Sequence, residues 1–201
     1  GAVTRTLIHE MNNIIMGIRG CTGDMLTTGT QESLEIAAAT EIAAVWLRAA
    51  GAIFNEPRIS LFPTPLSMIA ESAVQTIRKV KPEVTPILHS IRDSFVTVDV
   101  KTAGEAVALL SLLPLRRNDP VELINDGNVI RIFRPADEYT LDTSRLAGSS
   151  FFSAEEGLRT ITDKPDEFQF FLLAAYRNCV HNSIRLSFRI DQEKVETVFE
   201  F

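Results

Sequence analysis

Three polar residues near the start of the chain could act together in chemistry. His9 is followed directly by Glu10 and, one helical turn further on, by Asn13. An imidazole with the unperturbed pKa of about 6.5 is mostly neutral near pH 7, so a ring nitrogen can act as a nucleophile. Glu10 can accept a hydrogen bond from the other ring nitrogen. These residue types therefore predict a nucleophilic histidine that serves a partner.

A long amphipathic helix, from about Val3 to Met25, is expected to carry these side chains. Its apolar residues recur at alternating spacings of four and three, as in a coiled coil. They are Leu7, Met11, Ile14, Ile18, Cys21 and Met25. With Met11 at heptad position a, His9 falls at the outermost position f, and Asn13 falls at c on the same outward side. The seam is then buried while His9 faces solvent, although a lone histidine on a helix face is more often solvated than functional.

A second helix is expected from about Gln31 to Phe54, after a turn at Thr27–Thr30. Two long helices joined by a few residues form an antiparallel hairpin. A single hairpin cannot bury its apolar surface on both sides, and a second copy of the chain would complete a four-helix bundle across a two-fold axis. The pattern therefore predicts a homodimer. The segment Asn55–Thr64, with several prolines around it, is predicted to be a linker.

The rest of the chain is expected to form an α/β sandwich, one mixed sheet with helices on one face. One helix is expected to follow a Thr64-Pro65 cap, with Pro65 at its first position, and to run to about Val80. A second is expected to run from an Asp99 cap through Leu113. A short third helix should follow a Ser153/Glu156 capping box, and a fourth should run from Pro165 to about Val180. Strands are expected at 84–88, 95–98, 121–124, 129–133, 184–190 and 195–201. Asn125-Asp126-Gly127-Asn128 predicts a hairpin between two of them.

In this order, the elements resemble those of two-component histidine kinases. His9-Glu10-x-x-Asn13 matches the phospho-acceptor box, and Ser94–Asp99 with the helix after it resembles the strand and helix that carry the asparagine box. Val180–Ile184 resembles the end of the last kinase helix. The resemblance covers nearly the whole chain and implies an α+β fold with two domains. These are a dimerisation and histidine-phosphotransfer hairpin, residues 1–56, and a degenerate kinase-like ATPase domain, residues 57–201.

Two departures from the kinase pattern concern the nucleotide. Val100–Leu113 contains no asparagine to hold Mg²⁺ and phosphates, and the stretch Arg134–Tyr139 supplies acids but no glycine pair. The resemblance therefore narrows to histidine phosphotransferases of the alphaproteobacterial cell-cycle type, which keep the dimeric hairpin and a degenerate kinase-like domain. It implies that this chain carries no cofactor, and that Mg²⁺ lies in the receiver domain of its partner.

The same resemblance assigns roles to residues of the first helix. His9 would relay phosphoryl groups between response regulator receiver domains, fed by an upstream hybrid histidine kinase, and Asn13 matches a position that orients a hydrolytic water. Glycines inside a helix cost about 1 kcal/mol each relative to alanine. We expect Gly17 and Gly20 to leave a shallow surface for a receiver helix, although a tight contact within the bundle would explain them equally well. The expected receiver-binding residues are Asn12, Met16, Gly17, Arg19 and Gly20.

Composition excludes several other classes. The 201 residues are 45% hydrophobic and 23% charged, as in soluble globular proteins. A net charge of −6 argues against nucleic acid or an anionic membrane as the main partner. No apolar run approaches the roughly 20 residues of a membrane span, and no signal-peptide pattern is present. Two cysteines, Cys21 and Cys179, are predicted to be small buried hydrophobes in a reducing cytoplasm.

Two other functions remain open from the sequence. An atypical ATP-dependent histidine kinase would have to bind nucleotide despite the missing asparagine and glycines. A non-catalytic dimeric adaptor would dock receivers without using His9. Nucleotide affinity separates the first alternative from a phosphotransferase, and substitution of His9 separates the second.

Overall fold

A computed structural model of the chain describes its structure over most of its length. The described residues are 10–11, 13–14, 16–18, 30–54, 58–113, 115, 118, 120–135, 151–159, 166–190 and 194–201. His9, Asn12, Arg19, Gly20 and Cys21 lie outside the described residues. The predictions made for these five positions therefore stay predictions.

The described part is a mixed α+β structure, as the sequence predicted. Residues 10–11, 13–14 and 16–18 are helical and belong to the first helix. The other helices are α2 (Thr30–Phe54), α3 (Leu66–Val80), α4 (Val100–Ser111), α5 (Ala154–Arg159) and α6 (Glu167–His181). The strands are β1 (Phe62–Pro65), β2 (Ile87–Arg92), β3 (Phe95–Val98), β4 (Glu122–Asp126), β5 (Val129–Pro135), β6 (Phe151–Ser153), β7 (Arg185–Ile190) and β8 (Lys194–Glu200).

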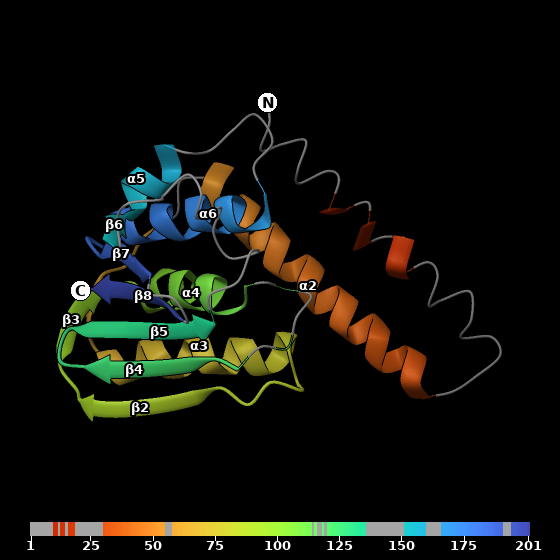
Figure 1. Cartoon of the computed structure of the whole chain (residues 1–201), viewed down its shortest axis with the longest axis horizontal. Helices are drawn as coiled ribbons and strands as arrows, with labels where there is room; N and C mark the ends of the chain where they lie inside the picture. The colour runs from red at the N-terminus through yellow and green to blue at the C-terminus, as the bar shows by residue number, and fades with distance from the viewer. Residues whose placement is uncertain are drawn as a thin grey trace.

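Six strands form one mixed sheet in the order β2-β4-β5-β8-β7-β6. Only β2 and β4 run parallel, and the other neighbours are antiparallel. One face of the sheet carries buried apolar side chains such as Leu123, Ile132 and Phe199, and α4 packs between α3 and α6 in the helical layer (Figure 1). The opposite face carries ion pairs that join neighbouring strands, including Arg131 with Glu196 at 3.3 Å. This is the two-layer sandwich that the sequence predicted.

Several local signals in the sequence are confirmed. Asp99 caps α4 and accepts a hydrogen bond from the Thr102 backbone N–H at 3.0 Å. In the turn between β4 and β5, Gly127 adopts a φ of +67°, the left-handed conformation that a glycine takes most easily. Ser153 and Glu156 form the predicted capping box, since each side chain accepts a hydrogen bond from the backbone N–H of the other.

Two expectations about the linker and the sheet are wrong. The strand β3 does not join the main sheet; it pairs with β1 in a separate two-stranded ribbon. Part of the predicted linker, from Phe62 to Thr64, is therefore a strand. Pro63 and Pro65 have no N–H to donate, and a two-stranded ribbon tolerates them because one edge of each strand needs no partner.

The cap of α3 also differs from the prediction. Thr64 does not cap the helix, because its Oγ1 donates to the Phe62 carbonyl instead. Pro65 is the N-cap residue rather than the first helical residue. The cap comes instead from a residue far along the sequence. The Ser67 backbone N–H and hydroxyl both donate to the Asp93 carboxylate, at 2.9 and 2.6 Å. Asp93 lies between β2 and β3, and such a remote cap leaves no local signal in the sequence.

The second half of α2 packs into the α/β layers rather than standing apart from them. Val45, Trp46, Ala49 and Ile53 are buried and belong to the same hydrophobic cluster as the helices α3, α4 and α6. In Figure 1, α2 leaves α6 and extends away from the sheet toward its N-terminal end. The core is therefore continuous across the predicted domain boundary at residue 56.

Candidate functional site

The described residues of the first helix have the predicted amphipathic pattern. Met11, Ile14 and Ile18, which were placed on the apolar seam, are half-buried, whereas Asn13 is exposed. Met16 is 71% exposed. Met16 stands at heptad position f, seven residues after His9, so position f of this helix faces away from the rest of the chain at that point.

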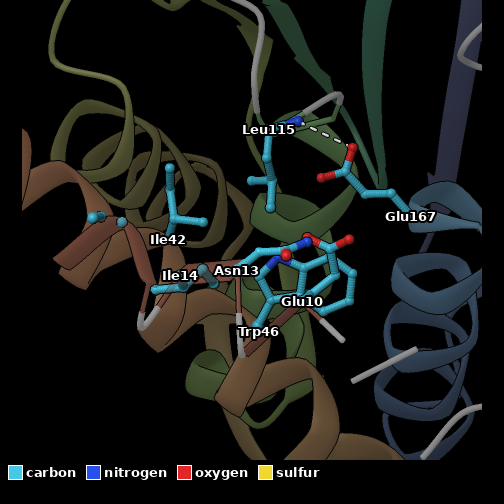
Figure 2. A pocket seen from close by; sticks show the side chains of 9 residues that line it. Glu10, Asn13, Ile14, Ile42, Trp46, Leu115 and Glu167 are labelled. Atoms are coloured by element: carbon cyan, nitrogen blue, oxygen red, sulfur yellow. Dashed lines mark hydrogen bonds between the residues drawn. The ribbon is translucent and has the colours of Figure 1, made fainter. Parts of the chain in front are cut away.

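A small pocket lies where the first helix meets α2 and the α/β layers. Its volume is about 190 Å³. It is lined by Glu10, Asn13, Ile14 and Gly17 of the first helix, Ala39, Ile42 and Trp46 of α2, and Leu115 and Glu167 of the α/β part. Figure 2 shows Leu115 and Glu167 facing the labelled side chains of both hairpin helices. The pocket thus brings together three of the predicted site residues, Glu10, Asn13 and Gly17, with Leu115 and Glu167 of the α/β part, which no sequence pattern had indicated.

Leu115 and Glu167 are joined by a hydrogen bond. Glu167 is the first residue of α6, directly after the N-cap Asp166. Its carboxylate accepts a hydrogen bond from the Leu115 backbone N–H at 3.4 Å (Figure 2). This contact joins the start of α6 to the segment after α4. The 52 residues that separate the partners explain why sequence spacing did not find them.

Gly17 has open space around it. A Cβ added there would meet no atom within 4 Å in the described part of the chain. No close contact among the described residues therefore requires a glycine at this position. Gly104 in α4 is the opposite case, because an added Cβ would lie 2.9 Å from the Ser72 hydroxyl.

Trp46, the single tryptophan of the chain, forms one wall of the pocket and joins α2 to α6. It is only 2% exposed. Its ring centroid lies 4.8 Å from those of Phe170 and Phe171, with tilted and edge-on geometry. Aromatic pairs in such arrangements contribute about 0.5–1.5 kcal/mol beyond their buried area. Trp46 therefore packs against the helical layer of the α/β part.

Two arginines tie the last turns of α2, after Trp46, to the α/β part. Arg48 pairs with Glu105 of α4 at 3.3 Å. Burial raises the pKa of the Glu105 carboxyl, and the charges of Arg48 and Lys101 partly offset that rise. Arg177 of α6 donates to the Ile53 carbonyl at 2.5 Å. A cation at this carbonyl also suits the negative end of the α2 dipole.

The other candidate groups are separate from the pocket. His89 is exposed on β2, with Nε2 3.4 Å from the Glu122 carboxylate. Cys179 is buried and free, as predicted, and burial raises the pKa of its thiol. Among the described residues, no cluster of three or more His, Cys, Asp or Glu side chains could hold a metal ion. Within that same part of the chain, every helix is too short or too polar to cross a membrane.

Comparison with known proteins identifies the fold. No protein-family model matches the sequence, and no curated protein matches it. A solved structure of a bacterial phosphotransferase is similar over 99% of this chain and 94% of that chain, with a TM-score of 0.58 and 11% identity. The structure of the Acinetobacter baumannii histidine kinase AdeS is similar over 96% of this chain and 96% of that chain, with a TM-score of 0.55 and 10% identity.

A third structure contains a partner protein. The histidine kinase ThkA, solved in complex with the response regulator protein TrrA, is similar over 100% of this chain and 61% of that chain, with a TM-score of 0.50 and 16% identity. At such low identities these similarities establish the fold alone. The chain has the fold shared by histidine kinases and a bacterial phosphotransferase.

The structure describes part of the two segments in which the sequence departs from the kinase pattern. The helix α4, in the place of the asparagine-box helix, contains no asparagine and buries an apolar face. At the end of β5, Arg134 follows Ile130 and Ile132 on the helix-covered face and is 3% exposed. Its Nη1 donates to the Leu113 carbonyl at 2.8 Å.

Proposed function

We propose that this chain is a histidine phosphotransferase that relays phosphoryl groups between receiver domains through His9. The observation that carries the proposal is a combination of features in one chain. His9 directly precedes the described residues of the first helix, a kinase-type α/β fold follows, and the sequence of that part lacks the asparagine and the glycine pair that the kinase resemblance requires for ATP. The similarity in fold to a bacterial phosphotransferase over almost the whole length supports the same function.

The proposed chemistry needs only the first helix and a receiver. A neutral ring nitrogen of His9 attacks the phosphorus of an aspartyl phosphate on one receiver. The nitrogen–phosphorus bond forms as the acyl phosphate oxygen–phosphorus bond breaks, and the aspartate leaves as a carboxylate. Glu10 accepts a hydrogen bond from the N–H of the other ring nitrogen and stabilises the positive ring. The aspartate of a second receiver then takes the phosphoryl group by the reverse step.

The receivers supply what this chain lacks. Mg²⁺ is expected in the receiver domain, and we assign no metal or cofactor to this chain. The complex of ThkA with a response regulator supports receivers as the class of partner. The exposure of Asn13, Met16 and Gly17 supports a docking surface on the first helix, to which Asn12, Arg19 and Gly20 are also assigned. Asn13 would orient a water in any residual dephosphorylation.

A homodimer through the hairpin is part of the proposal. One side of α2 packs on α6, yet Leu47 on another side is 52% exposed and Ile36 and Ile42 are only half-buried. A helix that is apolar on several sides needs cover on more than one of them. A second copy of the hairpin, residues 1–56, would supply that cover in a four-helix bundle. Analytical ultracentrifugation of the full chain tests this, with Leu47→Lys expected to weaken the dimer.

Phosphoryl transfer with radiolabel tests the relay itself. Wild type and His9→Ala are incubated separately with labelled ATP and with labelled phospho-receivers from the same organism, freed of ATP. The proposal predicts label on the wild type from a receiver alone, and none on His9→Ala. Label from ATP alone would make the chain a kinase. Receivers that bind the chain but transfer no label to it would make it an adaptor.

A further inference from the structure

The second half of α2 lies along α6, and the two helices touch at points two turns apart. Trp46 packs on the ring of Phe170, and seven residues further along each helix the Ile53 carbonyl accepts a hydrogen bond from Arg177 at 2.5 Å. Both helices therefore run in the same direction (Figure 1). At 1.5 Å per residue, the two contacts lie about 10 Å apart along each axis. A helix that is held at two such points cannot pivot on its neighbour without breaking one of them.

A third contact joins α2 to a second helix of the α/β part. Arg48 of α2 pairs with Glu105 of α4, and its Nε lies 3.3 Å from a carboxylate oxygen. The Glu105 side chain is only 17% exposed, so solvent and salt screen this pair less than an ion pair at the surface. Because α4 also packs against α6, α2 is held against two helices that are fixed to each other. Rotation of α2 about its own axis would break the ion pair.

The connection from α2 to β1 is also held near the end that enters the α/β part. Asp99, the N-cap of α4, uses its two carboxylate oxygens for different partners. Oδ1 accepts a hydrogen bond from the Thr102 backbone N–H, and Oδ2 accepts one from the Ser60 backbone N–H, both at 3.0 Å. The backbone N–H of Asp99 donates to Oδ1 of Asn182, the C-cap of α6, at 2.7 Å. Ser60 is thereby linked to the end of α6 through a single residue.

This bridge consists of a buried amide and a charged carboxylate. Asn182 is 5% exposed, and its Nδ2 donates to the Asn178 carbonyl and to Thr102 Oγ1, at 2.8 and 2.9 Å. Burial alone would raise the pKa of the Asp99 carboxyl, but hydrogen bonds, including those from Thr102 and Ser60, lower that pKa below its usual value. The carboxylate is therefore charged near neutral pH, and hydrogen bonds to a charged acceptor are stronger than those between neutral groups.

From these contacts we infer that α6 clamps both ends of the connection between the hairpin and the α/β part, so that the two move as one rigid body. Arg177 holds the end of α2, and Asn182 holds Ser60 through Asp99. A domain that carries a ligand to a second domain has to approach it and withdraw again. The clamp removes that motion, so the α/β part is a fixed support for the hairpin. The inference uses no step of the proposed relay, and either can fail alone.

The distance between two spin labels tests the rigid body. One label is attached at Thr40→Cys on α2 and the other at Glu71→Cys on α3, both at exposed positions outside the clamp. The background carries Cys21→Ser, and the buried Cys179 is expected to take no label, which mass spectrometry checks. Labelled chain is diluted into an excess of unlabelled chain so that only distances within one chain are measured. Double electron–electron resonance is expected to give one narrow distance distribution.

A double variant releases both ends of the connection. Asp99→Asn keeps one oxygen to cap α4, because asparagine is as good an N-cap as aspartate, but its amide NH₂ cannot accept a hydrogen bond from the Ser60 N–H. Arg177→Ala removes the bond to the end of α2. The matched control, Asp166→Asn with Arg185→Ala, changes the N-cap of α6 and an exposed arginine of β7 that are not part of the clamp. We expect the distance distribution to broaden, or to gain a second distance, in the first variant and to match the wild type in the control.

Each result decides one part of the inference. A broad or multiple distance distribution in the wild type overturns the rigid body, and this measurement needs no variant. A narrow distribution that the double variant leaves unchanged, or that the control broadens equally, overturns the clamp. Melts followed by circular dichroism establish that both variants fold, and if the double variant does not, Asp99→Asn alone takes its place with the same expectation. The relay is decided separately, by the transfer of label to His9.

Discussion

Trp46→Ala is the substitution that tests the packing of α2 on α6 most severely. The indole is buried and packs on two phenylalanine rings at 4.8 Å, so its removal deletes both ring contacts and leaves a cavity. Replacing a buried tryptophan or phenylalanine by alanine costs about 3–5 kcal/mol. Trp46 already lines the pocket, so part of the new cavity would open to solvent. The unfolding free energy should therefore fall by about 3 kcal/mol, at the lower end of this range. A domain of ordinary stability has only about 5–15 kcal/mol in total.

Urea unfolding followed by far-ultraviolet circular dichroism measures this loss. With a slope of about 1–3 kcal/mol per molar urea, the midpoint should fall by about 1 M or more. Thr40→Ala is the matched control, because Thr40 is exposed on the same helix, and its unfolding free energy should stay within about 0.5 kcal/mol of the wild type. A loss below about 1 kcal/mol for Trp46→Ala would refute the claim that α2 is built into the α/β core.

Three further substitutions test the reading of the helices. Gly104→Ala should lower the unfolding free energy by about 1–3 kcal/mol in urea titrations, because the new Cβ meets the Ser72 hydroxyl at 2.9 Å. The Cβ added by Gly17→Ala would meet no atom within 4 Å in the described part of the chain, so this variant should keep or raise the melting temperature through the higher helix propensity of alanine. It should slow phosphoryl transfer from the receiver. A melting temperature well below that of the wild type would contradict the open space at Gly17. Asp93 is exposed, and hydrogen bonds, chiefly from Ser67, hold the pKa of its carboxyl below the usual value. A carboxyl whose pKa is lowered by folding stabilises the folded state above its unfolded pKa of about 3.9, and this stability is lost as the pH falls through the pKa of the folded state. Asp93→Asn should therefore reduce the decline of the unfolding free energy below about pH 4. Urea unfolding at a series of acidic pH values measures this.

The parts of the fold that the sequence predicted depend on short stretches of chain. The Asp99 cap, the Ser153/Glu156 capping box and the turn at Gly127 each need only three or four neighbouring residues, and all three are present. The helices α3 and α6 were likewise predicted, and the buried residues of each lie at helical spacing within one stretch of chain. Such signals are visible before any tertiary contact is known.

The parts that were missed depend on residues far apart in the sequence. The ribbon of β1 and β3 pairs Phe62 with Val98, and prolines in β1 had indicated a linker. The cap of α3 comes from Asp93, 26 residues after the Ser67 that it serves. No local pattern distinguishes these partners from other aspartates and prolines.

The candidate site divides in the same way. Glu10, Asn13 and Gly17 were predicted from the spacing and family resemblance of the first helix, and they line one pocket. Leu115 and Glu167 were not predicted, because they reach the pocket only through the packing of α6 and the segment after α4. The catalytic roles of His9, Glu10 and Asn13 stay predictions.

Locating the phosphoryl group tests the central claim most directly. The full chain is incubated with a purified phospho-receiver, with no ATP present, and is then analysed by tandem mass spectrometry under conditions that preserve phosphoramidates. Because the chain has three histidines, the peptides that contain His9, His89 and His181 can be compared in one sample. The account predicts a phosphoryl group on the imidazole of His9 and on neither of the others. A group on His89 or His181, or one that appears only when ATP is added, would contradict it.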